Sequence, residues 1–419
     1  MSQFYTSFGK RLLDLIFAIL LALAVFPIIG ILLLLPEFRL LRKRRLGRSA
    51  EPFDEVRLRC PLTGVGHTLE RISFHRLPAL WNILLGQMSF VGPRALKEDE
   101  VRPEESAHIR FTLRPGFISP WWVRVRSNMT FDTEFSIDAE YAQNLSLKQD
   151  VGILLRAALA SVYGNDDSTE AAETLSLLGV RIDNTTTAIA IEHIDQVIRE
   201  KSTARISFVN ADSLNKAFSD HAFCEVINSS DVVLGDGIGI KIGAKLTRQT
   251  ILENVNGTDL FPRLCEHMSA NKQRLYLVGA KEGVPQLVRD WVEKMHPGVQ
   301  VVGVRNGFFQ PSENEEVCAG IRNAQADVLL LAQGAPRQET WIRDNLDSLG
   351  VPVAIGVGGL FDFYSGQTAR APIWMREAGI EWMYRLIQEP RRMFKRYILG
   401  NAIFIFRVLR YGERSGETK

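Results

Sequence analysis

The sequence predicts an α/β protein whose C-terminal half holds a mostly parallel sheet with flanking helices, preceded by a hydrophobic N-terminal helix. Two observations support this. From Val180 onward, short strands rich in β-branched residues alternate with helical stretches, and such repetition implies right-handed β-α crossovers. Leu12 to Leu35 is almost wholly apolar, about long enough to cross the roughly 30 Å hydrocarbon core of a bilayer. With 419 residues and 46% hydrophobic content, the chain can form two or three domains.

Pro27 lies near the middle of the apolar run. Proline removes a helix hydrogen bond and clashes with the preceding turn. We therefore expect either a kinked spanning helix or a helix that enters one leaflet, turns at Pro27 and leaves on the same side. A cleaved signal peptide fits less well, because the run is too long and no small-x-small site follows.

The formal net charge of +2 hides a local asymmetry. One basic block follows the apolar run, and a second basic run closes the chain. Basic residues that flank apolar segments favour an anionic membrane surface over nucleic acid. The block behind the apolar run also favours a cytoplasmic exit. The four cysteines have no CxxC spacing, which predicts reduced thiols and no zinc site. The first basic block consists of Arg39, Arg42, Lys43, Arg44, Arg45 and Arg48.

Six segments of the C-terminal half read as strands: Arg205 to Val209, Asp231 to Gly235, Arg274 to Gly279, Val299 to Gly303, Asp327 to Ala332 and Val353 to Val357. Carboxyl ends of parallel strands meet at one edge of a sheet, where ligands bind in open α/β folds. We expect five residues to meet at this edge: Asn210, Asp236, Gly279, Gln338 and Gly358.

The candidate site is organised around Asp231 to Ile240, DVVLGDGIGI. A short buried strand is broken by glycines into a tight turn that opens a helix at Ile238 to Leu246. Asp236 then sits between two glycines at a strand's carboxyl end, as a candidate base that a substrate can approach closely. The alternative is an Asp that merely caps the next helix.

A nicotinamide-binding domain is a second alternative. Gly235, Gly237 and Gly239 form GxGxG, but the third glycine of GxGxxG would fall at Ile240. The loop beginning at Leu277 could bind a phosphate at a helix N-terminus, yet it lacks the Lys-Ser/Thr ending of a P-loop.

Several motifs in order give residues from about 180 to 400 a resemblance to the WecG/TagA/CpsF glycosyltransferases, which have a Rossmann-like sheet. The motifs are Phe208-Val209-Asn210, Asp236-Gly237-Ile238-Gly239, Asn256-Gly257-Thr258-Asp259, Leu277-Val278-Gly279, Asn306-Gly307-Phe308-Phe309, Gly334-Ala335-Pro336-Arg337-Gln338-Glu339-x-Trp341, Gly356-Val357-Gly358-Gly359-x-Phe361-Asp362, Arg370-Ala371-Pro372 and Glu381-Trp382-x-Tyr384-Arg385-Leu386. The chain departs from the family at Phe208, where Thr is frequent, and at Asn254, where Arg is frequent. These departures bear on the donor more than on the reaction.

The resemblance implies an inverting, metal-independent transfer from a UDP-sugar to a polyprenyl-diphosphate-linked acceptor, without a cofactor. It implies that Asp236 is the base. It further implies that cations of the C-terminal tail stabilise the departing diphosphate. The substrate-binding positions that it implies are Asn210, Gly237, Gly257, Thr258, Gly279, Gln338, Glu339, Arg385, Arg392 and Lys395.

The N-terminal half resembles the bacterial polyprenyl-phosphate phosphoglycosyl transferases, which are monotopic, with a Pro-broken re-entrant helix. Those enzymes use an Asp-Glu pair, but His75 and Arg76 stand at the dyad positions here. A cationic pair cannot coordinate magnesium, so we expect a catalytically inactive membrane anchor. The motifs are Lys10-Arg11-x-x-Asp14, Arg45-Leu46-Gly47-Arg48, Leu77-Pro78-x-Leu80-Trp81-Asn82, Gly86-x-Met88-Ser89-Phe90-Val91-Gly92-Pro93-Arg94 and Arg114-Pro115-Gly116.

We therefore expect an enzyme of cell-surface polysaccharide assembly on the cytoplasmic face of the bacterial inner membrane, anchored by Leu12 to Leu35. Self-association is compatible with the family, and no nucleic acid is expected. A bifunctional enzyme that also initiates the glycolipid, and a noncatalytic scaffold for partner transferases, are the alternatives. The tail also fits a helix lying on an anionic bilayer. The expected domains are an anchor at 1–163, a linker at 164–179, a catalytic domain at 180–369 and a basic amphipathic appendage at 370–419.

Overall fold

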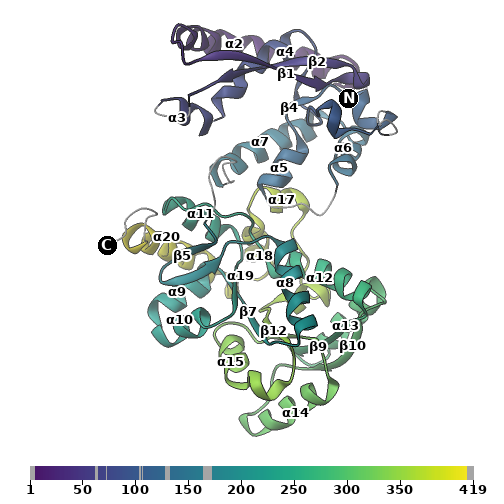
Figure 1. The fold of residues 1–419 in the computed structure, drawn as a ribbon, viewed down its shortest axis with the longest axis vertical. Coiled ribbons are helices and arrows are strands. Elements are labelled where there is room, and N and C mark those ends of the chain that lie inside the picture. Colours follow the sequence, from purple (N-terminus) through teal and green to yellow (C-terminus); the bar gives the residue numbers. More distant parts are fainter. Residues whose placement is uncertain are drawn as a thin grey trace. The chain divides into compact units, whose positions relative to one another are not determined.

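The computed structural model describes residues 5–61, 65–71, 73–102, 105, 107–127, 133–163 and 172–412. The chain divides into two compact units (Figure 1). Unit 1 comprises Met1–Ser168 together with Ile373–Gly379. Unit 2 comprises Thr169–Pro372 and Ile380–Lys419. The short segment 373–379 thus belongs to unit 1, although both of its flanks belong to unit 2.

Unit 2 contains a six-stranded sheet in the order β10-β9-β11-β12-β7-β8, with every pairing parallel. Its strands are β7 (Ala204–Val209), β8 (Val232–Gly235), β9 (Arg274–Gly279), β10 (Gln300–Arg305), β11 (Val328–Ala332) and β12 (Val353–Gly356). Every residue of β11 and β12 is buried, as expected for strands covered by helices on both faces. The predicted fold class is confirmed.

Helices connect these strands: α8 (Thr187–Glu200), α9 (Ala211–Ser219), α10 (His221–Asn228), α11 (Ile238–Leu246), α12 (Gly257–Asn271), α13 (Val284–Met295), α14 (Asn314–Ala324), α15 (Arg337–Leu349) and α16 (Leu360–Tyr364). After the segment in unit 1, the chain continues as α18 (Glu381–Gln388), α19 (Pro390–Phe394), the π-helical η8 (Lys395–Leu399) and α20 (Gly400–Tyr411).

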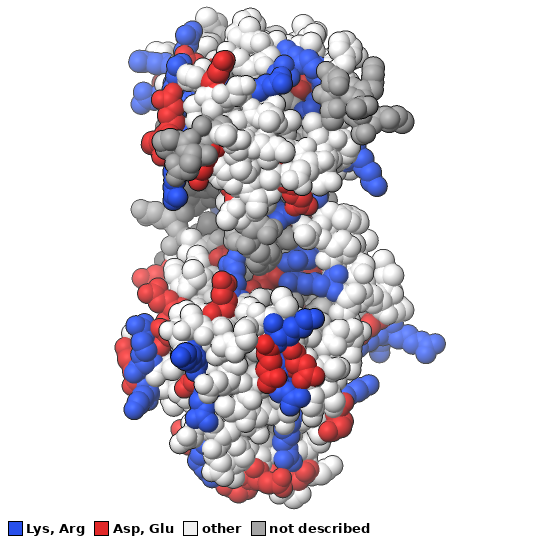
Figure 2. Space-filling model, turned by 90° about the vertical axis from the view of Figure 1, so that its right-hand side faces the viewer, with Lys and Arg blue, Asp and Glu red and all other residues white. Residues whose placement is uncertain are grey.

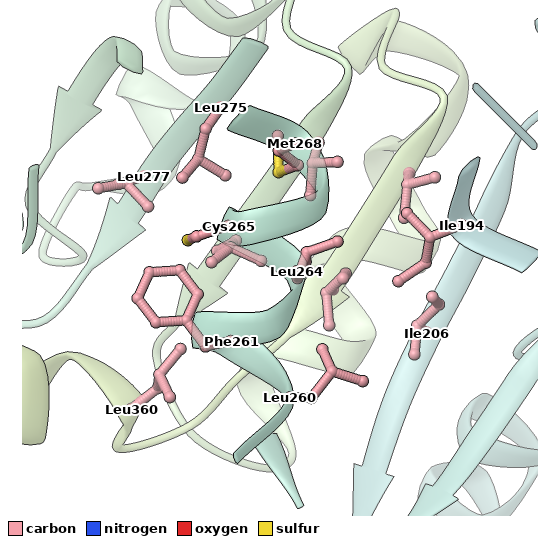
Figure 3. Close-up of a cluster of buried hydrophobic side chains, with 14 of the residues drawn as sticks. Ile194, Ile206, Leu260, Phe261, Leu264, Cys265, Met268, Leu275, Leu277 and Leu360 are labelled. Atoms are coloured by element: carbon pink, nitrogen blue, oxygen red, sulfur yellow. The ribbon is translucent and has the colours of Figure 1, made fainter. Parts of the chain in front are cut away.

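Helix α12 supplies much of the main core of unit 2. Leu260, Phe261, Leu264, Cys265 and Met268 repeat at helical spacing and face strands β7 and β9 (Figure 3). Each of these five side chains is at most 3% exposed. Close packing of these side chains holds this face of the sheet in place, and the sheet in turn supports the loops that follow its strands.

A second core lies on the opposite face of strands β7 and β8. The antiparallel hairpin of β5 (Thr174–Leu177) and β6 (Val180–Asp183) packs beside β8. Phe404 of α20 enters the same core, against the backbone of Gly243 in α11. Helix α20 therefore closes the hydrophobic core of unit 2.

Unit 1 is built on α2 (Lys10–Leu33) and the antiparallel pair β1 (Arg39–Leu46) and β2 (Pro52–Arg59). Its other elements are α3 (Val65–Arg71), η3 (Phe74–Ala79), α4 (Leu80–Leu84), β3 (Ser89–Val91), β4 (Gly116–Ile118), α5 (Pro120–Arg126), α6 (Glu134–Gln143), α7 (Leu147–Tyr163) and α17 (Ile373–Glu377). Pro27 lies inside α2, which continues past it for six residues.

Helix α2 has one covered face and one open face. Ala18, Val25 and Ile29 pack against β2, η3 and α4. Leu20 and Leu23 on the other side are 61% and 71% exposed. By length and composition, α2 is the one helix among the described residues that could cross a membrane. A single such helix is weak evidence for a membrane span.

Several predicted boundaries change in the structure. The predicted linker begins with residues that lie outside the described part, 164–171, but its last part forms β5. The chain after Asn210 forms two helices, because Asp220 ends α9 and its side chain caps α10. The basic block predicted as a membrane flank forms most of strand β1.

The surface carries charge of both signs. On the face drawn in Figure 2, Lys and Arg side chains lie interspersed with Asp and Glu. This pattern differs from the single basic stripe that proteins present to nucleic acid.

Candidate active site

The carboxyl ends of the parallel strands meet at one edge of the unit 2 sheet. Asn210 follows β7 and Asp236 follows its neighbour β8. Gly358 lies two residues after β12, which pairs with β7 on its other side. Gly279 ends β9, and Gln338 lies in the first turn of α15 after β11. The predicted convergence of these residues at one edge is therefore confirmed, whereas their roles stay predictions.

Asp236 does not cap the helix that follows it. The N-cap of α11 is Gly237, and within the described residues no side chain caps this helix. The backbone N–H of Asp236 donates to the carbonyl oxygen of Val209 at 2.7 Å. Gly237 has φ +88°, and a Cβ there would meet no described atom within 4 Å. The carboxylate is thus anchored at the sheet edge beside open space, and the capping alternative is wrong.

The surroundings of Asp236 tune its acidity. Burial raises the pKa of Asp236 to about 6, and the carboxylates Glu381 and Asp259 act in the same direction. Arg396 and Arg385 oppose the rise, because opposite charges favour the ionised form. A carboxylate with such a pKa is still mostly ionised at neutral pH and is a stronger base than an exposed Asp.

Two arginines of the C-terminal appendage face this carboxylate. The Arg385 guanidinium lies 5.0 Å from the ring centre of Phe363. A Cβ on Gly359 would approach Arg385 Nη2 to 2.9 Å, so a larger residue there would displace the guanidinium. Arg396 Nε lies 3.7 Å from a carboxylate oxygen of Asp212.

Arg392 and Lys395, the other two cations predicted for the site, are exposed. Arg392 Nη1 lies 3.2 Å from Glu389 and 3.8 Å from Asp362, and its side chain is 61% exposed. Both remain free to turn toward an anionic ligand at low cost, since exposed ion pairs contribute little stability.

A partly buried ion network holds the appendage near the site. Arg370 pairs with Asp259, and its Nε lies 3.5 Å from Glu381. Asn256 Nδ2 donates to Asp259 at 2.7 Å. Arg370 therefore balances the two carboxylates that raise the pKa of Asp236.

Gln338 connects two loops at the sheet edge. Its Oε1 accepts hydrogen bonds from the backbone N–H groups of Gly334 at 3.0 Å and Gly358 at 2.9 Å. Its Nε2 donates to Glu339 Oε1 at 2.8 Å. Burial raises the pKa of Glu339, whose Oε2 is buried without a hydrogen-bond partner among the described residues. Gln338 thus has a structural task besides any contact with a substrate.

The remaining predicted residues contribute to the backbone structure at this edge of the sheet. Asn210 Oδ1 caps α9 by accepting from the N–H groups of Asp212 and Ser213. The carbonyl of Thr258 accepts from the hydroxyl of Tyr364 at 2.6 Å. A Cβ added at Gly257 would lie 3.5 Å from Phe208, and one at Gly279 only 2.5 Å from Ala332 Cβ, so Gly279 permits close approach of β9 and β11.

His75 and Arg76 lie in unit 1, on η3. Burial lowers the pKa of His75, and Arg57, Arg76 and Lys43 lower it further against Glu70. A position surrounded by cations does not suit Mg²⁺, which prefers carboxylate and water oxygens. Nowhere in the described ranges do three or more His, Cys, Asp and Glu residues gather in a group that could hold a metal ion.

Residues 175–417, more than half of the chain, match the family model described as "Glycosyl transferase WecG/TagA/CpsF family". The chain belongs to this family. Residues 5–164 match the model described as "Bacterial sugar transferase". The WecG/TagA/CpsF match covers the sheet, the Asp236 edge and the appendage, and it favours glycosyl transfer over the nicotinamide alternative.

Two relatives share a name. An N-acetylglucosaminyldiphosphoundecaprenol N-acetyl-beta-D-mannosaminyltransferase of Bacillus subtilis (strain 168) is 34% identical over 195 residues, 46% of this chain and 75% of the relative. A protein of the same name from Staphylococcus aureus (strain MW2) is 26% identical over 236 residues, 56% of this chain and 91% of the relative.

Sequence reasoning on this WecG/TagA/CpsF member missed several residues around Asp236. The sequence places Arg396 only in a basic tail, and it places Arg370, Asp259 and Glu381 only in family motifs. Lys241 was not singled out; it is 3% exposed on α11, and burial lowers its pKa to about 7. The available signal for Arg396 was its spacing of four residues from Arg392, which puts both on one helix face.

Proposed function

We propose that this glycosyltransferase moves a sugar from a UDP-sugar to a polyprenyl-diphosphate-linked saccharide, with inversion at the anomeric carbon. The observation that carries the proposal is the Asp236 carboxylate, partly buried at the sheet edge beside Arg385 and Arg396. A base and a set of cations at one edge are the two groups that such a transfer requires.

In the proposed reaction, Asp236 takes the proton of the acceptor hydroxyl as its oxygen attacks the anomeric carbon. The bond to the diphosphate breaks, and negative charge grows on the departing UDP. Arg385 and Arg396 stabilise this charge, and Arg392 and Lys395 join them by turning from solvent. In this scheme the cations carry out what a metal ion does in other transferases, so no metal is required.

The names of the two relatives suggest the substrates to test first. Both name an N-acetylglucosaminyl-diphosphoundecaprenol acceptor and an N-acetylmannosaminyl group. Phe208 and Asn254 depart from the residues frequent in the family, and these departures bear on the donor, so the donor sugar is to be identified by screening. One hydroxyl on a donor is read by only a few contacts.

We propose that unit 1 anchors the enzyme at the cytoplasmic face of the inner membrane and does not catalyse phosphosugar transfer. The support is chemical: His75 and Arg76 replace a carboxylate pair. The covered face of α2 packs against β2, η3 and α4 of unit 1, and β1, which pairs with β2, carries five basic residues. A helix bound in this way fits a monotopic anchor better than a spanning one, because charged protein cannot follow it into the hydrocarbon core.

One assay separates the three functions. The full chain in lipid vesicles is mixed with UDP-ManNAc, UDP-GlcNAc, UDP-glucose or UDP-glucuronate, with polyprenyl phosphate or its GlcNAc diphosphate. We expect UDP release that requires the diphosphate-linked sugar. UMP release with polyprenyl phosphate would favour the bifunctional enzyme, and release of neither would favour the scaffold.

The Asp236→Asn variant tests the base in the same assay. We expect turnover to fall by about 10²- to 10⁴-fold, the usual contribution of a general base. Asp344→Asn is the matched control, because this carboxylate is 52% exposed on α15. A parental rate in Asp236→Asn would refute the assignment.

A further inference from the structure

Two neighbouring side chains in the first turn of α15 are buried and hydrogen-bonded to each other. Gln338 is 3% exposed and Glu339 is 4% exposed. Glu339 Oε1 accepts from Gln338 Nε2 at 2.8 Å. A Cβ on Gly356, the last residue of β12, would lie 2.9 Å from Gln338 Nε2. The amide of Gln338 is therefore packed against the end of this strand and has little room to move.

The carboxyl group of Glu339 selects the direction in which the Gln338 amide points. In the observed orientation, Gln338 Oε1 accepts from the backbone N–H groups of Gly334 and Gly358, at 3.0 and 2.9 Å. If the amide were turned over, its NH₂ group would face these two donors and its oxygen would face a carboxyl oxygen. Three buried hydrogen bonds would be lost, and buried polar groups without partners are costly. Glu339 thus favours the orientation that ties both loops to α15.

The loop that contains Gly358 also packs against Arg385. A Cβ on Gly359 would approach Arg385 Nη2 to 2.9 Å, and the guanidinium lies 5.0 Å from the ring centre of Phe363 in α16. Within the described part of the chain, Arg385 Nε is buried without a hydrogen-bond partner, and the guanidinium has no ion pair. Packing on this loop and this ring therefore sets the position of Arg385.

We propose that Glu339 is a positioning residue for the transfer reaction. By orienting Gln338, it holds the Gly358–Gly359 loop against which Arg385 packs. All of these residues belong to unit 2. The inference rests on the proposed function, in which Arg385 stabilises the departing diphosphate. It gives Glu339, which the family resemblance implies to be a substrate-binding residue, a role that requires a hydrogen-bond acceptor but neither a charge nor contact with the substrate.

Two substitutions of Glu339 separate a hydrogen-bond acceptor from a charge. Glu339→Leu keeps the bulk and removes the acceptor. We expect kcat to fall at least tenfold with less than a threefold change in acceptor KM, since Arg385 acts on charge that develops in the transition state. Glu339→Gln keeps an oxygen for the Gln338 amide, and its kcat should stay within fivefold of the parent. UDP release by the full chain in lipid vesicles measures both.

Glu315→Leu is the matched control for the loss of a carboxylate. Its side chain is 82% exposed on α14, so this variant should behave as the parent.

Hydrogen exchange tests the loop without any substrate. Exchange in residues 356–360 should accelerate at least tenfold in Glu339→Leu and stay parental in Glu339→Gln, because the first change releases the loop and the second does not. Exchange in strand β9 should stay parental in both variants. Acceleration throughout the sheet would overturn the inference, because Glu339 would then support the whole fold.

A double-mutant cycle shows whether the effect passes through Arg385. Arg385→Gln should lower kcat, and adding Glu339→Leu should lower it less than twofold further. Losses that multiply in the double variant would overturn the inference, as would parental kcat in Glu339→Leu or equal losses in both Glu339 variants. If the parent releases no UDP with any donor, the proposed function fails, whereas exchange in residues 356–360 still decides whether Glu339 holds the loop.

Discussion

At the scale of single residues, Asp236 shows how a common side chain acquires a special acidity. Its place after a strand brings it to the edge, but burial and four charged neighbours set its pKa. Two carboxylates and two guanidinium groups act on it in opposite directions. Because these groups come from α12, α18 and η8, the acidity of Asp236 depends on how the appendage is placed.

The pH dependence of transfer should follow this acidity. A base with a pKa of about 6 is protonated as the pH falls below 6. We therefore expect kcat/KM to be level near pH 7.5 and to fall about tenfold per pH unit below pH 6. A profile that stays level to pH 4.5 would contradict the assignment, because that behaviour belongs to an exposed Asp.

The same shift makes a prediction about stability. The folded state raises the pKa from 3.8 to about 6, so it favours the protonated form, and this favourable contribution is lost as the pH rises through 6. Asp236→Asn should thus be more stable than the parent at pH 8, by up to about 3 kcal/mol. The difference should shrink as the pH falls below 6 and vanish near pH 3, below the ordinary Asp pKa. Urea unfolding at both pH values measures it; equal stabilities at pH 8 would show that the carboxylate is not destabilised by burial.

At the scale of elements, helix α20 packs one face into the core of unit 2 and exposes another apolar face. Its sequence pattern does not predict this division. Phe404 and Val408 are 1% and 2% exposed and belong to the core beside α11. Phe406 and Leu409 on the same helix are 64% and 62% exposed. Arg407 Nη1 donates to the carbonyl oxygen of Asn215 on α9 at 2.7 Å. The helix is therefore a fixed part of unit 2 that also presents an apolar face.

Substitutions on the two faces of α20 should have different effects. Phe404→Ala should lower the free energy of unfolding by about 3–5 kcal/mol, because it leaves a cavity in a packed core. Phe406→Ala should leave stability within about 0.5 kcal/mol of the parent and reduce sedimentation with anionic vesicles. Urea unfolding and vesicle sedimentation measure the two effects. Equal destabilisation by both changes would rule out the division of faces.

At the scale of the whole molecule, we expect the open face of α2 to attach the protein to a membrane. Its covered face is built from small and branched residues such as Ala18 and Ala22, which let β2 and α4 approach closely. The start of the helix is fixed by Asp14, whose carboxylate accepts from the backbone N–H of Phe90 at 3.0 Å. Leu20 and Leu23 are left for a hydrophobic environment.

Lysines on the open face should release the full chain from the membrane. We expect Leu20→Lys with Leu23→Lys to move the protein into the soluble fraction without unfolding, because each charge disfavours the bilayer interior by a few kcal/mol. Leu252→Lys is the control, since this leucine is 46% exposed in unit 2. Retention of the double variant in the membrane fraction would mean that other surfaces provide the anchor.

The strands and the site edge follow directly from local patterns. Each predicted strand of the C-terminal half exists, with ends shifted by at most two residues. Local patterns could not give the break at Asp220, because two short helices and one long helix have the same apolar spacing. They also could not give β1, since its five basic residues resemble a loop at a membrane until β2 supplies Glu55 and hydrogen bonds opposite them.

By itself, the sequence determined the α/β class, the apolar helix and the position of Asp236 after a strand, because periodicity and glycine turns act over neighbouring residues. Only the tertiary structure decided which charges surround Asp236 and that Glu377 belongs with Arg124 and Arg156. Apart from Asp259, these groups lie more than 100 positions from the residues they act on, and no local preference encodes such a pairing. Such pairings form when whole helices pack and buried charges must find partners.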